Sequence, residues 1–157
     1  MDYTIRPLSP EDEPVLWEML YFALYRAQEE APPREVVQRP ELARYVEGWG
    51  REGDRGFLAH AAGGDQVLGA AWLRLPQGEH KGYGYVDDAT PELAFAVHPQ
   101  HRKRGIGTAL LTQLVRATPD EAAIAISIAA ANPVLRLYER FGFKVIHQSA
   151  GAITLRR

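Results

Sequence analysis

The chain contains no cysteine among its 157 residues. Disulfide frameworks, thiolate metal sites and cysteine nucleophiles are therefore all excluded. A chain without disulfides suits a reducing compartment, so the sequence predicts a cytoplasmic protein. Its length is usual for one folding unit, and we expect a single domain over residues 1–157 that buries its core without a metal ion.

The chain also has no large excess of positive or negative charge and no long hydrophobic run. The 18 basic and 20 acidic residues leave a formal net charge of −2, which gives no field that attracts nucleic acid or an anionic membrane. No apolar run approaches the ~20 residues of a membrane-spanning helix, and the N-terminus lacks the basic-then-apolar order of a signal peptide. We therefore expect no nucleic-acid and no membrane partner, but a small-molecule or peptide partner.

The first two thirds of the sequence predict strands interrupted by two amphipathic helices. Ser9 is a suitable N-cap for the first helix, whose apolar residues recur at helical spacing as far as Leu24. A glycine-rich turn at 63–65 is typical of a β-hairpin. The expected elements are strands at 3–7, 56–62, 67–75 and 92–97, and helices from Ser9 to Leu24 and from about Pro40 to Trp49.

Beyond residue 97 the expected order is glycine loop, helix, strand, helix and hairpin. Leu110 and Leu114 lie on one apolar stripe of the first of these helices. Asn132 is a suitable N-cap for the second helix, and Gly142 is a suitable C-terminal stop. The expected elements are a helix at 107–117, a strand at 122–130, a helix between Asn132 and Gly142, and a hairpin of 143–148 with 152–156.

The loop that opens the helix at 107–117 carries the clearest chemical signal. Gly105 and Gly107 allow backbone amides to point at an anion, and the helix that follows adds unpaired N–H groups and a positive dipole end. Arg102, Lys103 and Arg104 supply positive charge beside these amides. The pattern predicts a phosphate site, with a tight turn beside a solvated basic patch as the alternative.

Two other nucleotide-binding loops do not match this segment. The chain has no G-x-x-x-x-G-K-[ST] sequence, which excludes a P-loop. The dinucleotide fingerprint requires a third glycine where this chain has Leu110.

Two motifs in the same order resemble the GNAT superfamily of N-acetyltransferases. Arg102-x-x-Gly105-x-Gly107 matches the (Q/R)-x-x-G-x-(G/A) signature of that family at a strand-to-helix junction. Downstream, Asn132 opens a helix, Tyr138 follows six residues later, and a Gly-Phe pair closes the segment at 142–143. The resemblance implies an α/β (α+β) fold with a mixed, mostly antiparallel sheet of six to seven strands and about four helices on both faces. It also implies a parallel strand pair flanking the helix at 107–117.

The resemblance further implies that acetyl-CoA is the co-substrate. The loop amides from Arg102 to Thr108 would hold the CoA pyrophosphate, and the strand at 92–97, which splays from its neighbour, would pair with the pantetheine arm. Asn132 would contact the same arm, with a simple N-cap as the alternative. The implied cofactor-binding residues are Ala96, Val97, Arg102, Lys103, Arg104, Gly105, Ile106, Gly107, Thr108 and Asn132.

Tyr138 and Glu92 are the expected catalytic residues, and no metal ion is expected. A thiolate leaves more readily when protonated, and the motif implies that the Tyr138 hydroxyl, with a pKa of about 10, lies at the sulfur. The alternative for Tyr138 is a core residue. Glu92 alternates with Ala94 and Ala96 on one face of the strand and is expected to take the proton of the acceptor amine. The other candidates for this base are Asp87, Asp88 and His98.

No motif identifies the acceptor. Aromatic and acidic residues of the first two helices and of the loop before Glu92 are typical of an amphipathic pocket for an amine. We expect acetyl transfer to a primary amine of a small molecule or peptide, with a homodimer as a possible assembly. A domain that binds CoA without turnover, as a sensor or an assembly module, is the alternative. The aromatic residues expected in this acceptor pocket are Trp17, Tyr21, Tyr25, Tyr45, Trp49, Tyr83 and Tyr85, and the acidic ones are Glu79, Asp87 and Asp88.

Overall fold

A computed structural model of the chain describes residues 3–24, 33–76, 85–87, 89–101, 105–118, 122–129, 135–149 and 151–157. Its strands are β1 (Tyr3–Pro7), β2 (Arg55–Ala61), β3 (Val67–Arg74), β4 (Glu92–Val97), β5 (Ala125–Ala129), β6 (Lys144–Ser149) and β7 (Ala152–Arg156). Its α-helices are α1 (Glu13–Leu24), α2 (Pro40–Ala43), α3 (Ile106–Ala117) and α4 (Leu135–Arg140). Short 3₁₀-helices lie at Pro10–Asp12, Arg34–Gln38 and Pro99–His101.

The strands form one 7-stranded sheet in the order β1-β2-β3-β4-β5-β7-β6. Neighbouring strands are antiparallel except β4 and β5, which are parallel. The mixed, mostly antiparallel sheet and the parallel pair on either side of α3 are therefore confirmed. The described helices include none that is long and apolar enough to cross a bilayer.

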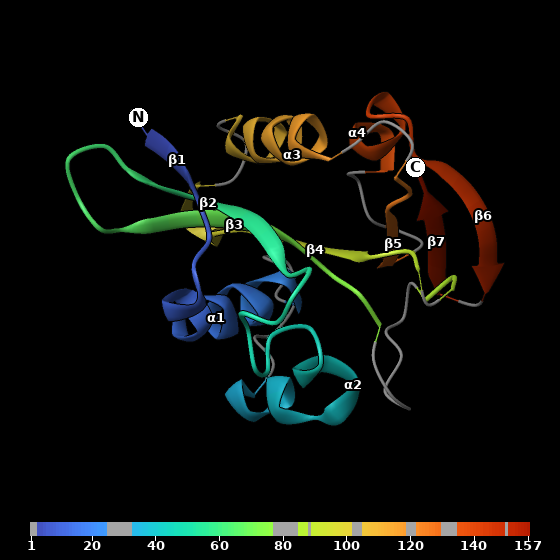
Figure 1. Ribbon diagram of the computed structural model, residues 1–157, viewed down its shortest axis with the longest axis horizontal. Helices are drawn as coiled ribbons and strands as arrows, with labels where there is room; N and C mark the ends of the chain where they lie inside the picture. Colours follow the sequence, from blue (N-terminus) through green and yellow to red (C-terminus); the bar gives the residue numbers. More distant parts are fainter. Residues whose placement is uncertain are drawn as a thin grey trace.

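The sheet lies between two layers of helices, with α3 and α4 on one side and α1 and α2 on the other (Figure 1). The core on the α3 side includes Leu110 and Leu114 with Ile126, which confirms the expected apolar stripe of that helix. The core on the α1 side includes Leu16 and Trp72. β4 belongs to both cores, because alternate side chains of a strand point to opposite faces.

The start of α1 is held by Asp12. The backbone N–H of Ser9 donates to Asp12 Oδ2 at 2.8 Å, and the guanidinium of Arg6 donates to both carboxylate oxygens at 2.8 and 2.9 Å. The Arg6 hydrogen bonds lower the pKa of Asp12 to about 2. Ser9 begins the helical segment as expected, although its first turn is a 3₁₀-helix.

The second helix is shorter than expected, because α2 spans only Pro40–Ala43 and turns follow it. Two side chains of β3 take the carbonyls that would continue the helix: Trp72 Nε1 donates to the Tyr45 carbonyl at 2.9 Å, and Arg74 Nη1 donates to the Arg44 carbonyl at 3.0 Å. In an α-helix these carbonyls would accept from residues four positions later. Gly48, with φ 72°, then turns the chain.

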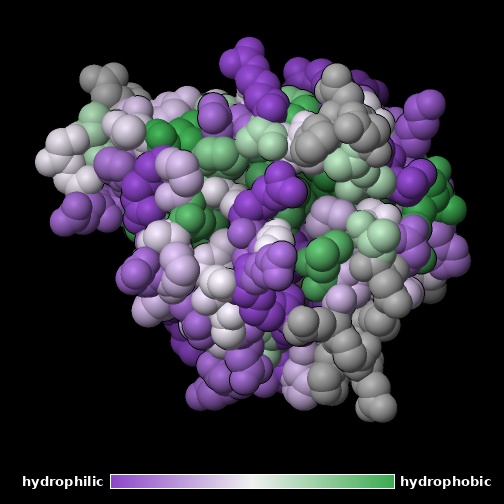
Figure 2. All heavy atoms as spheres, in the orientation of Figure 1, coloured by the Kyte–Doolittle hydropathy of each residue, from purple (hydrophilic) through white to green (hydrophobic). Residues whose placement is uncertain are grey.

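The C-terminal hairpin is confirmed by the antiparallel pairing of β6 with β7. Gly142, with φ 93°, ends the α4 segment as expected. β6 is exposed along its whole length, with Val145 37% and Ile146 49% accessible to solvent. Hydrophobic residues are visible at the right edge of Figure 2, where β6 lies.

Candidate functional site

β4 and β5 pair only where they begin. Their register consists of one pair, Glu92 opposite Ala125, and the Ala125 N–H donates to the Pro91 carbonyl at 3.0 Å. Beyond this pair, the two strands share no register pair within the described residues. β4 therefore separates from β5 along most of its length, while it stays paired with β3 from Glu92 to Val97.

The backbone groups of β4 alternate between its two neighbours. The His98 N–H donates to the Leu68 carbonyl at 2.7 Å, on the β3 side. By the alternation of an antiparallel ladder, the backbone of Ala96 also faces β3, whereas the backbones of Phe95 and Val97 face β5. Of the two expected pantetheine contacts, Val97 thus faces the separated edge and Ala96 does not. Phe95 is a residue on this edge that the sequence analysis missed.

The N-terminus of α3 has the geometry expected of an anion site. Gly105, with φ 79°, is the N-cap in a left-handed conformation, and among the described residues no side chain caps the helix. The first amides of a helix have no intrahelical partner, so those of Ile106, Gly107 and Thr108 are directed away from the helix body. Thr108 is exposed, and a Cβ atom on Gly105 would meet no heavy atom within 4 Å. Arg102, Lys103, Arg104 and Asn132 lie outside the described residues.

Gly107 also has a packing role that the motif did not indicate. A Cβ atom at this position would lie 2.7 Å from Phe95 Cζ, closer than a side chain tolerates. Glycine therefore allows the first turn of α3 to approach β4, independently of any bound phosphate. This close approach places the Phe95 ring directly beneath the helix N-terminus.

Tyr138 lies on the α3 side of the sheet and is 2% exposed. Its ring packs edge-on against Phe95, with centroids 6.3 Å apart, and against Phe143 at 5.7 Å. Burial raises the pKa of the Tyr138 phenol. Phe95 thus contacts Tyr138 and lies against Gly107, so one side chain connects the expected acid with the expected phosphate loop.

Glu92 lies on the opposite face of β4, the face of Ala94 and Ala96 that packs against α1. It is 3% exposed; the Tyr45 hydroxyl donates to its Oε2, and Arg44 Nη1 lies 3.6 Å from its Oε1. Arg74, opposite Glu92 in the β3–β4 register, pairs with Asp54 at 3.2 Å. The sequence analysis missed the role of Arg44 and Tyr45 beside this carboxylate, because they come from a distant segment.

The other candidates for the base have different surroundings. The Asp87 carboxylate accepts hydrogen bonds from the Thr90 hydroxyl and the Ala89 N–H, both at 2.9 Å. The Thr90 hydrogen bond lowers the pKa of Asp87, so this residue is already engaged in a turn. Asp88 lies outside the described residues. His98 Nδ1 accepts a hydrogen bond from the Gln100 N–H at 3.2 Å.

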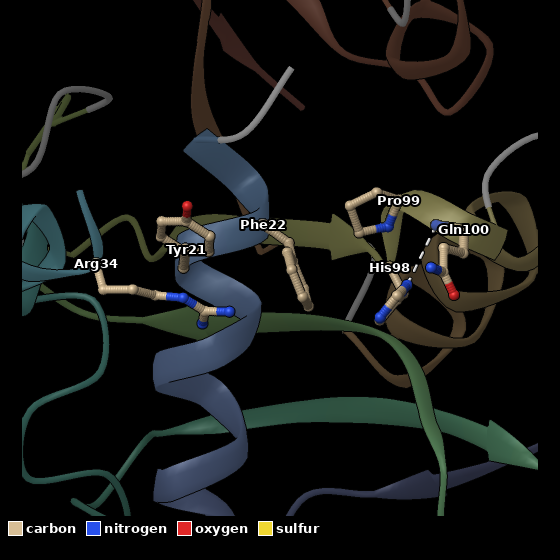
Figure 3. Close-up of a pocket in the computed structure, with 6 residues that line it drawn as sticks. All are labelled: Tyr21, Phe22, Arg34, His98, Pro99 and Gln100. Carbon is tan, nitrogen blue, oxygen red and sulfur yellow. Dashed lines mark hydrogen bonds between the residues drawn. The ribbon is translucent and has the colours of Figure 1, made fainter. Parts of the chain in front are cut away.

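His98 also lines a cavity of about 350 Å³ between α1 and the segment that follows β4 (Figure 3). Figure 3 shows Tyr21 and Phe22 on α1, Arg34 extending past Tyr21, and His98 beside Gln100. The six lining residues are Tyr21, Phe22, Arg34, His98, Pro99 and Gln100.

The aromatic residues expected around an acceptor separate into several groups. Tyr21 lines the cavity, and Tyr45 contacts Glu92. Trp49 Nε1 donates to the Ser9 carbonyl at 3.1 Å, and Trp17 Nε1 donates to Glu13 at 3.2 Å. Tyr85 is 38% exposed, while Tyr25, Glu79 and Tyr83 lie outside the described residues.

The described part of the chain contains no group of three or more histidine, aspartate or glutamate side chains that could hold a metal ion.

The comparison with protein families identifies this arrangement. A family model described as the Acetyltransferase (GNAT) family matches residues 17–143. The chain therefore belongs to the GNAT acetyltransferase family, which confirms the resemblance noted in the sequence. No curated protein matches the chain.

Solved structures of acetyltransferases share the fold. A PaiA N-acetyltransferase from Thermoplasma acidophilum in complex with coenzyme A is 18% identical, with 100% of this chain and 99% of that chain covered and a TM-score of 0.67. YncA from Salmonella typhimurium with its cofactor acetyl-CoA is 20% identical, with 99% of this chain and 92% of that chain covered and a TM-score of 0.64. The ribosomal-protein-S18-alanine N-acetyltransferase of Escherichia coli is also 20% identical, with the same coverage of 99% and 92% and the same TM-score of 0.64.

Proposed function

We propose that this chain is an acetyl-CoA-dependent N-acetyltransferase that acts on a primary amine of a small molecule or a peptide. The observation that carries the proposal is the separation of β4 from β5 immediately before the uncapped N-terminus of α3. A strand that separates from its neighbour, followed by the uncapped start of a helix, is suited to an extended ligand that ends in phosphates.

The described residues fit acetyl-CoA. The amides of Ile106, Gly107 and Thr108 would hold the pyrophosphate, and the β5-facing edge of β4 at Val97 would pair with the pantetheine arm. The fit rests on the uncapped first turn of α3, in which Gly105 and Thr108 are exposed, and on the open space around Gly105. The sequence motifs add Arg102, Lys103, Arg104 and Asn132 to the proposed cofactor site, whereas the Ala96 backbone, which faces β3, is not part of it.

Acetyl-CoA supplies an acetyl group activated as a thioester: the amine nitrogen bonds to the carbonyl carbon, the carbon–sulfur bond breaks, and an amide and a thiol result. Two protons move in this reaction. Tyr138 is the proposed donor to the leaving sulfur, and Glu92 is the proposed acceptor of the amine proton. Tyr138 and Glu92 lie on opposite faces of β4, so each of the two proton transfers has its own proposed group.

Burial has two consequences for Tyr138. The raised pKa keeps the phenol protonated at every pH near neutrality, so the donor is always in its active form. The same shift makes complete proton transfer less favourable. We therefore propose that Tyr138 first stabilises the developing thiolate by a hydrogen bond.

The test is the release of free thiol from acetyl-CoA in the presence of primary amines, peptides and polyamines, combined with mass measurement of the acetylated product. We expect amine-dependent thiol release with equal amounts of amide formed. Tight binding of acetyl-CoA without thiol release for any amine would contradict catalysis and favour a CoA-binding sensor or assembly module. Cytoplasmic location, a single domain over residues 1–157 and a homodimer stay predictions from the sequence.

A further inference from the structure

We propose that Phe95 is a positioning residue for acetyl transfer, because its ring sets the place of the Tyr138 phenol relative to the first turn of α3. Gly107 is glycine because the tip of this ring occupies the space that a side chain would need. The inference rests on the proposed acetyltransferase function, in which the first turn holds the phosphates and Tyr138 serves the sulfur of the same molecule. The Phe95 ring acts through Tyr138 and takes no part in the proton transfers itself.

The Phe95 ring points its tip at Gly107. A Cβ atom on Gly107 would lie 2.7 Å from Cζ of Phe95 and 3.6 Å from both Cε1 and Cε2. The two equal distances show that the ring meets this position end-on. Cζ lies on the axis about which the ring turns at χ2, so a ring flip leaves it in place. Only a change of χ1 or a movement of the backbone can relieve the contact.

The same ring also packs against Tyr138. The two ring centroids are 6.3 Å apart and the ring planes are 79° from parallel, which is an edge-to-face arrangement. Phe143 contacts Tyr138 in the same manner, at 5.7 Å and 72°. Tyr138 is 2% exposed, and a protein core is close-packed. A displaced Phe95 ring therefore has to displace the phenol or leave a void beside it.

The backbone of Phe95 is held more firmly than its side chain. β4 stays paired with β3 from Glu92 to Val97, and Phe95 lies opposite the fully buried Ala71 in this register. The Phe95 side chain is half-buried. A side chain introduced at Gly107 would thus move the ring about χ1 and leave the strand in place.

The required shift of the ring is large on the scale of the reaction. Carbon atoms in ordinary contact are about 3.5–4.0 Å apart, so the ring tip has to retreat by roughly 1 Å from a Cβ atom at 2.7 Å. A misplacement of about 1 Å can cost about 100-fold in rate. The amides of the first turn belong to the backbone, which alanine keeps helical. Gly107→Ala should therefore lower kcat more than it weakens acetyl-CoA binding.

Bound phosphates would give a different reason for glycine at this position, because their oxygens would also occupy the space of a side chain. The two reasons differ in their dependence on Phe95. If the ring is the obstacle, a smaller or more flexible residue at position 95 makes Gly107→Ala harmless. If the phosphates are the obstacle, Gly107→Ala weakens acetyl-CoA binding by the same factor whichever residue stands at position 95.

The experiment introduces Gly107→Ala into the wild type and into Phe95→Leu, Phe95→Met and Phe57→Leu, with kcat measured by thiol release and the Kd of acetyl-CoA by calorimetry. We expect kcat to fall at least about tenfold in the wild type and in Phe57→Leu, and to change less than about twofold in the two Phe95 variants. The Kd should stay within about twofold throughout. Phe57→Leu is the matched control, because Phe57 is a half-buried phenylalanine of β2 that packs against the same core.

A measurement without turnover separates this inference from the proposed function. The ring signals of Tyr138 are followed by NMR in the same variants without acetyl-CoA. We expect Gly107→Ala to shift these signals in the wild type and in Phe57→Leu, and to leave them in place in the two Phe95 variants. Equal effects of Gly107→Ala in all four backgrounds, or no effect in the wild type, would overturn the inference. Absence of thiol release with every amine would instead contradict the proposed function, while the Tyr138 signals would still decide the role of Phe95.

Discussion

The two faces of β4 bury different kinds of side chain. On the α3 face, Phe95 packs against the buried ring of Tyr138. On the α1 face, Glu92 contacts Arg44 and Tyr45, and His98 lines a cavity with a cation at its edge. The difference indicates a division of labour. The α3 side, called the apolar face here, buries the phenol of Tyr138 among aromatic rings, whereas the α1 side, called the polar face, buries the carboxylate of Glu92 beside Arg44 and Tyr45.

The largest effect is expected from Glu92→Leu, which removes the charge from the polar face. The side chain of Arg44 is 8% exposed, so removing the Glu92 carboxylate leaves a largely buried positive charge without the negative charge that offsets its desolvation. Breaking a buried pair in this way typically costs ~3–5 kcal/mol. Urea denaturation should detect this loss. Exposed Glu47→Gln is the control, and a cost of Glu92→Leu below about 1 kcal/mol would mean that the pair contributes little.

Tyr138→Phe tests the apolar face and should reduce turnover about 100-fold, with about tenfold as the smallest reduction expected of a replaced proton donor. The ring stays in the core, so the fold and the Kd of acetyl-CoA should be retained. Because burial raises the pKa of Tyr138, the alkaline fall in the wild-type rate should begin above about pH 10 and should be absent in the variant.

Tyr3→Phe is the control for this variant, since Tyr3 is a partly buried tyrosine of β1 at the edge of the same core. If Tyr138 were only a core residue, its hydroxyl would contribute about 0.5–1.5 kcal/mol to stability and nothing to the rate. Near wild-type turnover with an unchanged pH profile would support that alternative.

Thr108→Glu tests the end of the apolar face at which the phosphates are proposed to bind. A carboxylate in the first turn of α3 is favourable for the helix, so the fold should be retained. It should repel the pyrophosphate and raise the Kd of acetyl-CoA at least about tenfold, the size of one lost charge-assisted hydrogen bond. Calorimetric titration measures this, with exposed Gln113→Glu as a control of equal charge. Equal affinities for the two variants would place the phosphates elsewhere.

The smallest effect is expected from Asp12→Asn, which removes the carboxylate that holds the start of α1. The pKa of Asp12 is about 2 in the folded protein, held down by Arg6, against about 3.9 in an unfolded chain. Because folding lowers its pKa, the Asp12 carboxylate stabilises the folded state fully above about pH 4, and this stabilisation is lost as the pH falls toward 2. Asp12→Asn should therefore cost about 1–2 kcal/mol at pH 7, after allowance for the exposure of Arg6, and almost nothing at pH 2. A cost independent of pH would contradict this role.

The apolar face was largely predictable because its determinants are local in sequence. The glycines at 105 and 107, the leucine stripe of α3 and the spacing from Asn132 to Tyr138 all lie within short segments whose period and turn chemistry identify the elements. The strand expected at 122–130 is β5, and the isoleucines at 124, 126 and 128 lie in the α3 core. The contacts of Phe95 with Gly107 and with Tyr138 required the structure.

The polar face was not predictable in the same way, because its contacts join distant segments. Tyr45 and Glu92 are 47 residues apart, and no local pattern relates them. Trp72 and Arg74 take the carbonyls that would extend α2, so side chains of β3 overrode the helical period expected up to Trp49. The cavity combines Arg34, Tyr21 and His98 from three elements, which no spacing rule connects.

A crystal structure of the chain with acetyl-CoA tests the proposed site most directly. We expect the pyrophosphate oxygens within hydrogen-bond distance of the Ile106, Gly107 and Thr108 amides, and the pantetheine arm along the edge of β4 that separates from β5. The sulfur should lie next to the Tyr138 hydroxyl. Phosphates bound away from the N-terminus of α3, or a sulfur remote from Tyr138, would contradict both the cofactor site and the proposed acid.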